Sequence, residues 1–428
     1  MTTTTRTTMR TTTRPGTAPA TRPRKAYRTT AAVAVAAACA TLATALPATA
    51  GATPPRDHDA QLRQVLQQDA DALLTLGTPG VLAELDRAGR RDITVRAGYG
   101  DVAAQTPVPE NGRFRIASVT KPFVAATLLQ LVGEGRLSLD DTVEQHLPGL
   151  VQGNGNDGNL VTIRQLLQHT SGLPEYLAAM PQLFSEEGFQ QHRFDEVSQQ
   201  EAIALAMTQA PTFAPGTSWN YSNTNYVLAG MVIEQVTGNT WQHEVRERIV
   251  RPLGLRHTTL PGSSSDIPGP HAIGYERFPG EGATPEDPRY GEAIDATELN
   301  PSWAGAAGEI ISTTDDVNEF LQALAGGRVL RPAQWVEMTA TVAASEEFRA
   351  NWPGARYGLG IMWVPNSCGG MWAHGGDIQG FMTRNGVTPD GRRSVVVSFN
   401  TDSPVPQPGA QVPAGDIATQ LIDDALCR

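Results

Sequence analysis

Hydrophobic and polar residues alternate near both ends of this chain, which is the pattern of half-buried β-strands. Near the start, PGVLAELDRAGRRDITVRAGYGD (residues 79–101) predicts a hairpin that turns at Asp86 to Arg91, after an amphipathic helix around 60–74. Near the end, GFMTRNGVTPDGRRSVVVSFN (380–400) predicts a second hairpin that turns at Pro389-Asp390-Gly391. Residues 417–426 have the pattern of a closing helix.

Between the two hairpins, apolar residues recur at the spacing of amphipathic helices. These helices are expected at 119–132, 163–167, 226–236 and 317–324. Because strands from distant parts of the chain flank this helical stretch, we expect a mixed α+β (α/β) fold, with one antiparallel sheet flanked by helices and a helical insertion. The expected domain covers 60–428, with the sheet drawn from 60–115 and 300–428 and a mostly helical part at 120–300.

Residues 1–50 have the features of a secretory signal peptide. The first 28 residues hold seven basic and no acidic side chains, and the apolar run Ala31–Leu46 leads into Ala48-Thr49-Ala50, a small-residue cleavage pattern. The apolar run is shorter than the roughly 20 residues that span a membrane. We therefore expect cleavage, a short linker at 51–59, no stable membrane span, and a protein secreted into the cell-wall space. A retained membrane anchor at this run is the alternative.

Charge and cysteine content narrow the function classes further. The whole chain has a formal net charge of −11, and removal of residues 1–50 takes seven of its 33 basic residues, leaving 26 against 44 acidic ones, about −18. A nucleic-acid partner is excluded, because such binding depends on clustered basic side chains. With Cys39 removed, Cys368 and Cys427 remain, and two cysteines in a secreted chain predict one disulfide.

The stretch RIASVTKPF (115–123) contains Lys121, which is the one lysine outside the predicted signal peptide. A buried lysine can lose its proton near neutral pH and act as a base, whereas an arginine stays protonated. Lys121 follows Ser118 by three residues, a spacing that places both side chains on one helix face. Alone, S-x-x-K is a weak signal, because a helix start with a solvated lysine has the same pattern.

Two further segments supply polar groups in a fixed order. Tyr221-Ser222-Asn223 precedes an apolar helix, and His374 precedes two glycines at the head of a predicted strand. Either segment alone fits a structural tyrosine or histidine. Other hydrolase signatures are missing: GTSWN (216–220) lacks the second glycine of G-x-S-x-G, and the eight histidines show no zinc-binding cluster.

Together, the ordered set S-x-x-K, Y-x-N and H-x-G resembles the serine β-lactamase and penicillin-binding-protein superfamily, in its class C branch, and particularly secreted D-alanyl-D-alanine carboxypeptidases. The segments LLQHTSGLP (166–174), YSNTNYVLAGMVIEQVTG (221–238) and SWAGAAGEIISTTDD (302–316) are similar to family segments as well. The resemblance covers roughly residues 60–427.

The resemblance implies a serine hydrolase that forms an acyl-enzyme on Ser118, with Lys121 and Tyr221 as the base apparatus and the choice between them open. Asn223 would hold a substrate carbonyl, His374 would line the opposite wall, and the N–H groups of Ser118 and Asp377 would form the oxyanion hole, worth about 3 kcal/mol per donor. The remaining positions implied to border the cleft are Gly375, Gly376, Gln379 and Trp303. No metal or cofactor is implied. The expected partners are D-alanyl peptides of peptidoglycan or related small esters and amides, with β-lactams as covalent inhibitors of a monomer.

The sequence departs from the carboxypeptidase pattern at the site for the substrate carboxylate. Relatives use hydroxyls in the third motif and an arginine upstream of it, but here the motif is His374-Gly375-Gly376-Asp377 and the arginine position falls at or near Met362. An unpaired Asp377 carboxylate would repel a substrate carboxylate. An esterase or D-aminopeptidase-like hydrolase is therefore the alternative to a carboxypeptidase; a β-lactamase or a non-catalytic binding protein is less favoured.

Overall fold

A computed structural model describes residues 55–280, 282–284 and 289–428. The predicted signal peptide, residues 1–50, and the first part of the predicted linker lie outside the described residues. The first described helix, α1 (Pro55–Thr75), begins five residues before its predicted start. A proline is well tolerated there, because the first turn of a helix leaves its N–H groups unbonded in any case.

A ten-stranded antiparallel sheet forms the centre of the domain, in the order β10-β11-β12-β13-β15-β16-β1-β2-β3, with β14 paired to β15. Its strands are β1 (Gly80–Arg87), β2 (Ile93–Asp101), β3 (Thr106–Pro107), β10 (Val342–Ala343), β11 (Arg356–Tyr357), β12 (Met362–Val364), β13 (Met371–Ala373), β14 (Gly376–Ile378), β15 (Phe381–Val387) and β16 (Arg393–Phe399). Both predicted hairpins are present, the first with its turn slightly later than expected. The mixed fold with an antiparallel sheet and flanking helices is confirmed.

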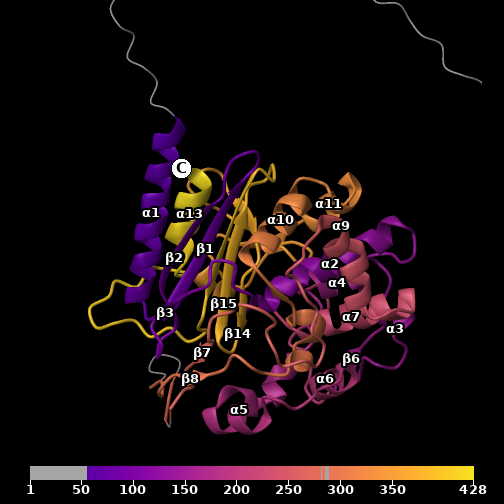
Figure 1. Ribbon diagram of the computed structural model, residues 1–428. Coiled ribbons are helices and arrows are strands. Elements are labelled where there is room, and N and C mark those ends of the chain that lie inside the picture. The colour runs from indigo at the N-terminus through magenta and orange to yellow at the C-terminus, as the bar shows by residue number, and fades with distance from the viewer. Residues whose placement is uncertain (1–54, 281, 285–288) are drawn as a thin grey trace, which may run out of the picture. The chain divides into compact units, whose positions relative to one another are not determined.

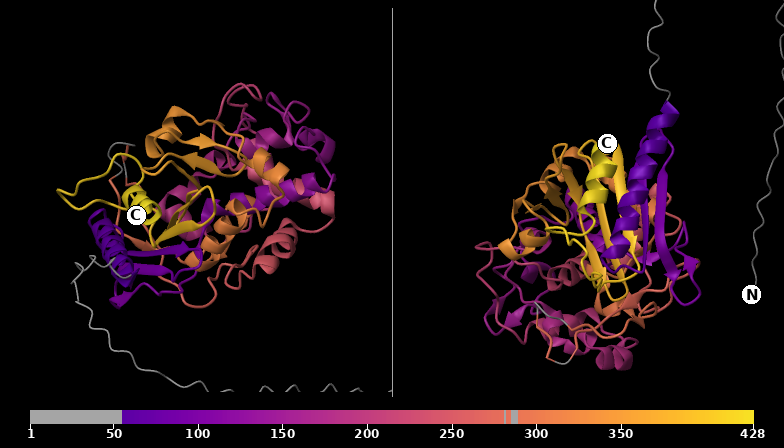
Figure 2. Two further views of the ribbon diagram at one scale, coloured as in Figure 1. Left: turned by 90° about the horizontal axis from the view of Figure 1, so that it is seen from above. Right: turned by 90° about the vertical axis from the view of Figure 1, so that its left-hand side faces the viewer.

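The central strand β16 is buried on both faces, and successive valines along it point to opposite faces of the sheet. Val395 and Val397 share a hydrophobic cluster with α1 and α13 (Thr419–Cys427), whereas Val396 belongs to the cluster on the other face. Successive side chains of a strand point to opposite faces, so an unbroken apolar run is what a strand between two layers needs. Figure 2 shows α1 and α13 side by side on the outer face of the sheet.

Most of the helices lie on the opposite face. They are α2 (Thr120–Gly133), α3 (Val143–His146), α4 (Ile163–Gln168), α5 (Glu186–His192), α6 (Gln199–Ala206), α7 (Thr224–Thr237), α8 (Trp241–Val245), α9 (Arg251–Leu253), α10 (Thr314–Ala325) and α11 (Pro332–Met338). The short helix α12 (Glu346–Asn351) instead packs its Phe348 against the cluster that α1 and α13 share. Three two-stranded pairs accompany them: β4 (Phe114–Arg115) with β9 (Ile311–Ser312), β5 (Gln152–Gly153) with β6 (Asn156–Asp157), and β7 (Tyr275–Glu276) with β8 (Ile294–Asp295).

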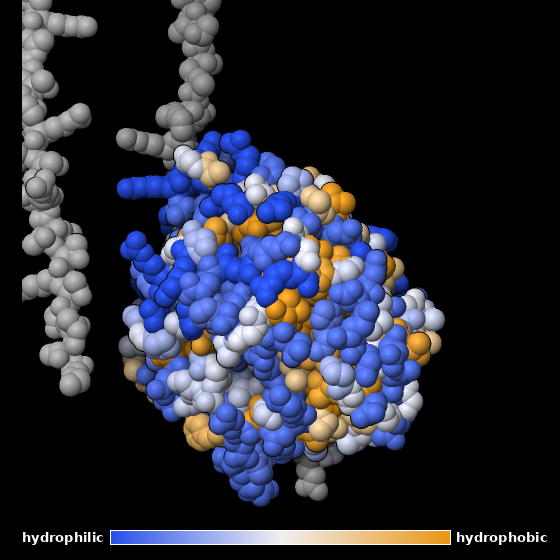
Figure 3. Space-filling view, turned by 90° about the vertical axis from the view of Figure 1, so that its right-hand side faces the viewer, coloured by the Kyte–Doolittle hydropathy of each residue, from blue (hydrophilic) through white to orange (hydrophobic). Residues whose placement is uncertain are grey.

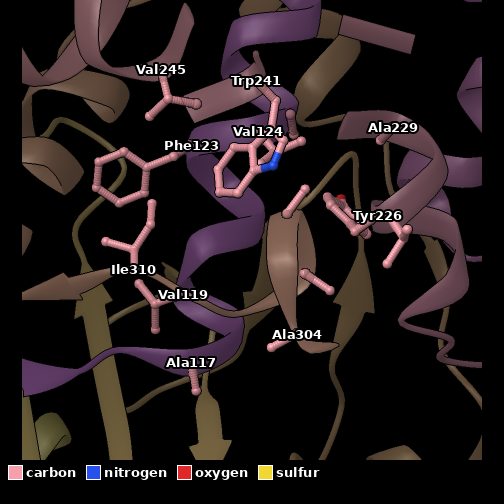
Figure 4. Packing of buried hydrophobic residues seen from close by; sticks show 14 of the residues in the cluster. Ala117, Val119, Phe123, Val124, Tyr226, Ala229, Trp241, Val245, Ala304 and Ile310 are labelled. Atoms are coloured by element: carbon pink, nitrogen blue, oxygen red, sulfur yellow. The ribbon is translucent and has the colours of Figure 1, made fainter. Parts of the chain in front are cut away.

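Helix α2 is the core of this helical layer. Nearly all of its residues are buried, and it is apolar around its whole circumference, as a central helix must be. Figure 4 shows its Phe123 and Val124 packed beside Trp241 and Val245. Because α2 is enclosed, the residues at its N-terminal end are held in a rigid frame.

Hydrophilic residues dominate the face of the molecule drawn in Figure 3, with apolar residues between them. Among the described residues, no helix is long and apolar enough to cross a membrane. Cys368 and Cys427 are joined in a disulfide with their Cα atoms 5.5 Å apart, which ties the loop before β13 to α13.

Candidate active site

Ser118 lies in a single 3₁₀ turn (Ala117–Val119) that leads directly into α2. The preceding residue, Ala117, has a φ of +49°, in the left-handed region that non-glycine residues avoid. Such a conformation costs about 1–3 kcal/mol and is found mostly at functional sites, where the surroundings enforce it. Here the enforcement comes from burial of Ala117 and from the hydrogen bond of Ile116 N to Ile310 O, 2.9 Å.

The strand β14 packs directly against this turn. A Cβ atom added to Gly376 would lie 2.1 Å from Ile116 O and 3.1 Å from Ser118 N, so the contact requires glycine. A Cβ atom at Gly375 would meet nothing closer than 3.4 Å. The second glycine of the His-Gly-Gly motif is therefore the one that lets β14 approach the nucleophile.

Lys121 is fully buried and bonded to three oxygens. Its Nζ lies 2.9 Å from Ser118 Oγ, 2.7 Å from Asn223 Oδ1 and 2.8 Å from Ala307 O. Burial lowers the pKa of Lys121 to about 7, although Glu175 and Asp377 favour its charged form. As a neutral amine it can still donate to Asn223 and Ala307, which leaves its lone pair for the Ser118 hydroxyl proton.

Tyr221, three residues before α7, lies beside the Ser118 hydroxyl as well. Burial raises the pKa of its phenol, which a hydrogen bond with Ser118 only partly offsets. The Lys121 Nζ lies 4.8 Å from the centre of its ring. Tyr221 therefore remains a neutral phenol at pH 7, while Lys121 titrates there.

Two neutral histidines flank Tyr221. The ring of His169 lies 4.3 Å and the ring of His374 6.3 Å from the Tyr221 ring, centre to centre. Burial lowers the pKa of His374 to about 3 and that of His169 well below its usual value. His374 Nδ1 donates to Gly375 O (2.6 Å), because a carbonyl can only accept, so its Nε2 accepts from the Tyr357 hydroxyl (2.8 Å).

Glu175 orients Asn223. Its Oε2 accepts from both Asn223 N (2.6 Å) and Asn223 Nδ2 (3.1 Å), so Oδ1 of the amide must face Lys121. Burial raises the pKa of Glu175, and the hydrogen bonds from Asn223 and Leu177 oppose this rise. One amide proton of Asn223 stays available for a substrate.

Asp377 is not the unpaired carboxylate that the sequence predicted. Arg384, on β15, donates to its Oδ1 at 2.6 Å and also bonds Asp416. Burial lowers the pKa of Arg384, but the two carboxylates outweigh this and the pKa is raised. The prediction that an arginine is missing here was wrong, because Arg384 reaches this place from a neighbouring strand; Met362 also borders the cleft.

Two cavities meet at Ser118, and both are also lined by Asn223 and Asp377. The smaller one, about 90 Å³, has Trp303 and Gln379 in its walls together with Asp402. The larger one, about 480 Å³, is lined by Tyr221, His374 and Gly375 and by Arg384 and Asp416. Below they are called the small cavity and the large cavity.

Residues 62–418 match the family described as Beta-lactamase. This chain belongs to the β-lactamase family. The match covers nearly the whole described domain, so the protein is a serine hydrolase of the β-lactamase and penicillin-binding-protein fold.

Several proteins that resemble this chain have names that specify the D configuration. The crystal structure of a D-stereospecific amidohydrolase from Streptomyces sp. is 43% identical, with 79% of this chain and 94% of that chain covered and a TM-score of 0.72. The D-amino acid amidase of Ochrobactrum anthropi SV3, in complex with L-phenylalanine amide, is 26% identical, with 85% and 97% covered and a TM-score of 0.71. The D-aminopeptidase of Cereibacter sphaeroides is 28% identical over 347 residues, which are 79% of this chain and 60% of that protein. This chain spans about half the length of other curated relatives it matches.

The structure brings all ten catalytic and substrate-binding residues expected from the sequence to one place. Nine of them line a cavity or bond Ser118 directly, and Gly376 packs against the Ser118 backbone. The residues that sequence reasoning missed are His169, Glu175, Arg384, Asp402 and Asp416. His169 and Glu175 had a detectable signal, since His169 lies within the family segment 166–174 and Glu175 directly follows it; Arg384, Asp402 and Asp416 had none.

Proposed function

We propose that this protein is a D-stereospecific amidohydrolase, which cleaves amides, esters and short peptides of D-amino acids through an acyl-enzyme at Ser118. The relatives named as a D-stereospecific amidohydrolase, a D-amino acid amidase and a D-aminopeptidase support this assignment over the D-alanyl-D-alanine carboxypeptidase expected from the motifs. It corresponds to the alternative that the sequence left open.

The observation that carries the proposal is that the guanidinium of Arg384 is already paired with two carboxylates of the protein. A carboxypeptidase needs a free cation for the C-terminal carboxylate of its substrate, but the guanidinium of Arg384 is already bound by Asp377 and Asp416. One cation and two carboxylates leave the large cavity with a net negative charge. We assign this cavity to the leaving group, where a neutral amide or alcohol, or a cationic amine, is favoured over an anion.

In the proposed reaction, the neutral amine of Lys121 takes the Ser118 proton while Oγ attacks the substrate carbonyl carbon. The developing oxyanion accepts hydrogen bonds from the N–H groups of Ser118 and Asp377. The proton then passes, with the Tyr221 phenol as carrier, to the leaving nitrogen as the C–N bond breaks. Water then attacks the carbonyl carbon of the resulting ester and gives a proton to the same base. The base returns this proton to Ser118 Oγ as the bond between Oγ and the acyl carbon breaks, which releases the D-amino acid.

We also propose that the protein acts outside the cell as a monomer and that β-lactams acylate Ser118. Export is supported by the basic start, the apolar run and the Ala48-Thr49-Ala50 pattern of residues 1–50. D-alanyl amides or peptides derived from peptidoglycan are proposed as substrates in this setting when the D-alanyl unit has a free amine and the leaving group has no free carboxylate.

The test compares three substrates with purified enzyme: D-alaninamide, L-alaninamide, and a diacetyl-lysyl-D-alanyl-D-alanine peptide with a free C-terminus. We expect kcat/KM to favour D-alaninamide over L-alaninamide at least 100-fold and over the free-acid peptide at least tenfold, with all activity lost in Ser118→Ala. A free-acid peptide hydrolysed fastest would identify a carboxypeptidase instead.

A further inference from the structure

The small cavity contains a carboxyl group that the proposed reaction does not use. Asp402 lies beyond the end of β16 and lines this cavity together with Asp377 and Gln379. The segment that carries it is held by β7, since Tyr275 N bonds Asn400 O (2.9 Å) and Arg277 N bonds Ser403 Oγ (2.6 Å). Its side chain is thus part of a fixed wall close to the nucleophile.

Gln379 provides an independent sign that a ligand belongs here. Its side chain is only 6% exposed, and its Nε2 donates to Leu183 O at 3.0 Å. Its Oε1 is buried and accepts no hydrogen bond from any of the described residues. A buried acceptor without a donor costs about 1–3 kcal/mol, so a donor group in the cavity would be stabilised at this place.

Asp402 and Asp377 both line the small cavity, and the negative charge of Asp377 disfavours a second negative charge on Asp402. Arg384 lies 2.6 Å from Asp377 and stabilises the negative charge there, so a proton is favoured on Asp402. Burial and the charges of Asp377 and Glu276 all raise the pKa of Asp402, against the effect of Arg384. Before a substrate binds, protonation of Asp402 is therefore favoured, whereas a bound cation would favour its carboxylate form.

We propose that the small cavity is the subsite for the α-ammonium group of the D-amino acyl unit, which donates hydrogen bonds to the carboxylate of Asp402 and to Oε1 of Gln379. This inference rests on the proposed function and specifies its substrates as acyl groups with a free amine. When the ammonium binds, Asp402 releases its proton to solvent, so one positive charge replaces another beside Asp377.

The size of the cavity limits the acyl side chain. About 90 Å³ is less than the roughly 150 Å³ that accommodates a benzene molecule in a protein interior. A D-alanyl unit fits this space, whereas a D-phenylalanyl ring requires the wall to move. We therefore expect small D-amino acids to be better acyl donors than aromatic ones.

The experiment uses p-nitroanilides that share one leaving group: D-alanyl, L-alanyl and propionyl, the last of which lacks only the amine. We expect kcat/KM for the D-alanyl substrate to exceed that for the propionyl substrate at least 100-fold. If the enzyme cleaves both equally, the ammonium subsite is wrong while the proposed function stands. If it cleaves neither the D-alanyl p-nitroanilide nor D-alaninamide, the proposed function itself is wrong.

Variants locate the subsite. Asp402→Asn is expected to raise KM for the D-alanyl substrate at least tenfold and to leave kcat/KM for the propionyl substrate within twofold of wild type. Gln379→Met, which keeps the side-chain volume but removes the acceptor, is expected to do the same more weakly, and it serves as the test if Asp402→Asn does not fold. The matched control is Asp140→Asn, which removes an 83% exposed carboxylate that lines neither cavity. Equal losses on both substrates would show a structural role only and overturn the proposal.

A pH series gives a readout that packing alone would not change. The groups that face Asp402 are Asp377, Glu276, Tyr290 and Arg384. Because the pKa of Asp402 is raised, its proton competes with the ammonium at low pH, so KM for the D-alanyl substrate should fall as pH rises while the substrate amine stays protonated. The propionyl substrate should show no such fall, and Asp402→Asn should abolish it. A wild-type KM that is independent of pH would contradict the proposal.

Discussion

Nη1 of Arg384 lies 2.6 Å from Oδ1 of Asp377, and this ion pair connects the two cavities that meet at Ser118. Arg384 faces the large cavity, whereas Asp377 faces both. In the proposed assignment of the two cavities, the pair sets the charge that faces the leaving group on one side and the acyl group on the other. Asp416 binds Nε of the same guanidinium, so two carboxylates of the protein balance the positive charge of Arg384.

Removal of one of these carboxylates is expected to change which leaving group is preferred. Asp416→Asn keeps the side-chain shape, including the Oδ1 that accepts from Ala418 N at 2.9 Å, but leaves Arg384 with a single carboxylate partner. The ratio of kcat/KM for a D-alanyl-D-alanine peptide to that for its C-terminal amide should rise about three- to tenfold. The same ratio in Asp140→Asn should match wild type. An unchanged ratio in Asp416→Asn would show that the charge around Arg384 does not determine which leaving group is preferred.

The basicity of Lys121, rather than its charge, is expected to be essential. Lys121→Arg preserves a cation but removes the group that can lose its proton near pH 7, so acylation of Ser118 should slow by about 10²–10⁴-fold. The measurement is the rate of labelling by a fluorescent penicillin, with peptide mapping of the modified serine. Normal labelling of the arginine variant would exclude Lys121 as the base.

The pH dependence of the wild-type reaction should report the same group. The amine form is active, and burial lowers the Lys121 pKa from 10.5 to about 7, so kcat/KM should rise with pH through a midpoint near 7. A neutral acyl donor such as propionyl p-nitroanilide isolates this group from the titration of Asp402. A flat profile between pH 5 and pH 9 would be inconsistent with Lys121 as the base.

The two glycines of the third motif should differ sharply in their tolerance of a methyl group. Gly376→Ala places Cβ 2.1 Å from Ile116 O, a backbone atom, and should cost about 1–3 kcal/mol of unfolding free energy as well as most of the activity. Gly375→Ala brings Cβ no closer than 3.4 Å to any atom and should stay within about 0.5 kcal/mol of wild type. Urea unfolding of both variants makes the comparison, and equal losses would show that the close approach of β14 is not what requires glycine.

The Cys368–Cys427 disulfide should contribute measurably to stability. The two cysteines are 59 positions apart, and closing a loop of this length restricts the unfolded chain by about 4 kcal/mol. A double Cys→Ser variant should show a lower melting temperature than the oxidised protein, whereas both proteins should melt alike under strong reductant. Titration of two free thiols in the unreduced, unfolded protein would disprove the bond.

The sequence was most informative where periodicity and turn residues agreed. The β15–β16 hairpin was predictable because Val395, Val396 and Val397 follow a Pro-Asp-Gly turn. The strands β10, β11 and β12 were not, since two or three residues are too few to show a period. Their existence depends on pairing with a sheet that is already formed.

The candidate site divides in the same way. Ser118, Lys121 and Tyr221 were predictable because their spacing and order resemble a known family. The partners of Arg384 were not, because Asp377 lies seven residues before it and Asp416 32 residues after it, and no local rule joins an arginine to such positions. Asp402 was hidden for a further reason, since its role depends on which neighbours share its proton.

The register that places Val81 opposite Phe399 brings together residues more than 300 positions apart. Such non-local pairing makes folding slow, because the chain loses the entropy of closing a long loop before the stabilising contacts form. The strand β14, which packs against the Ser118 turn, also comes late in the chain. During translation, Ser118 and Lys121 therefore leave the ribosome long before β14, the strand that completes their site. The site is thus incomplete in a nascent chain until β14, in the last quarter of the chain, has been synthesised.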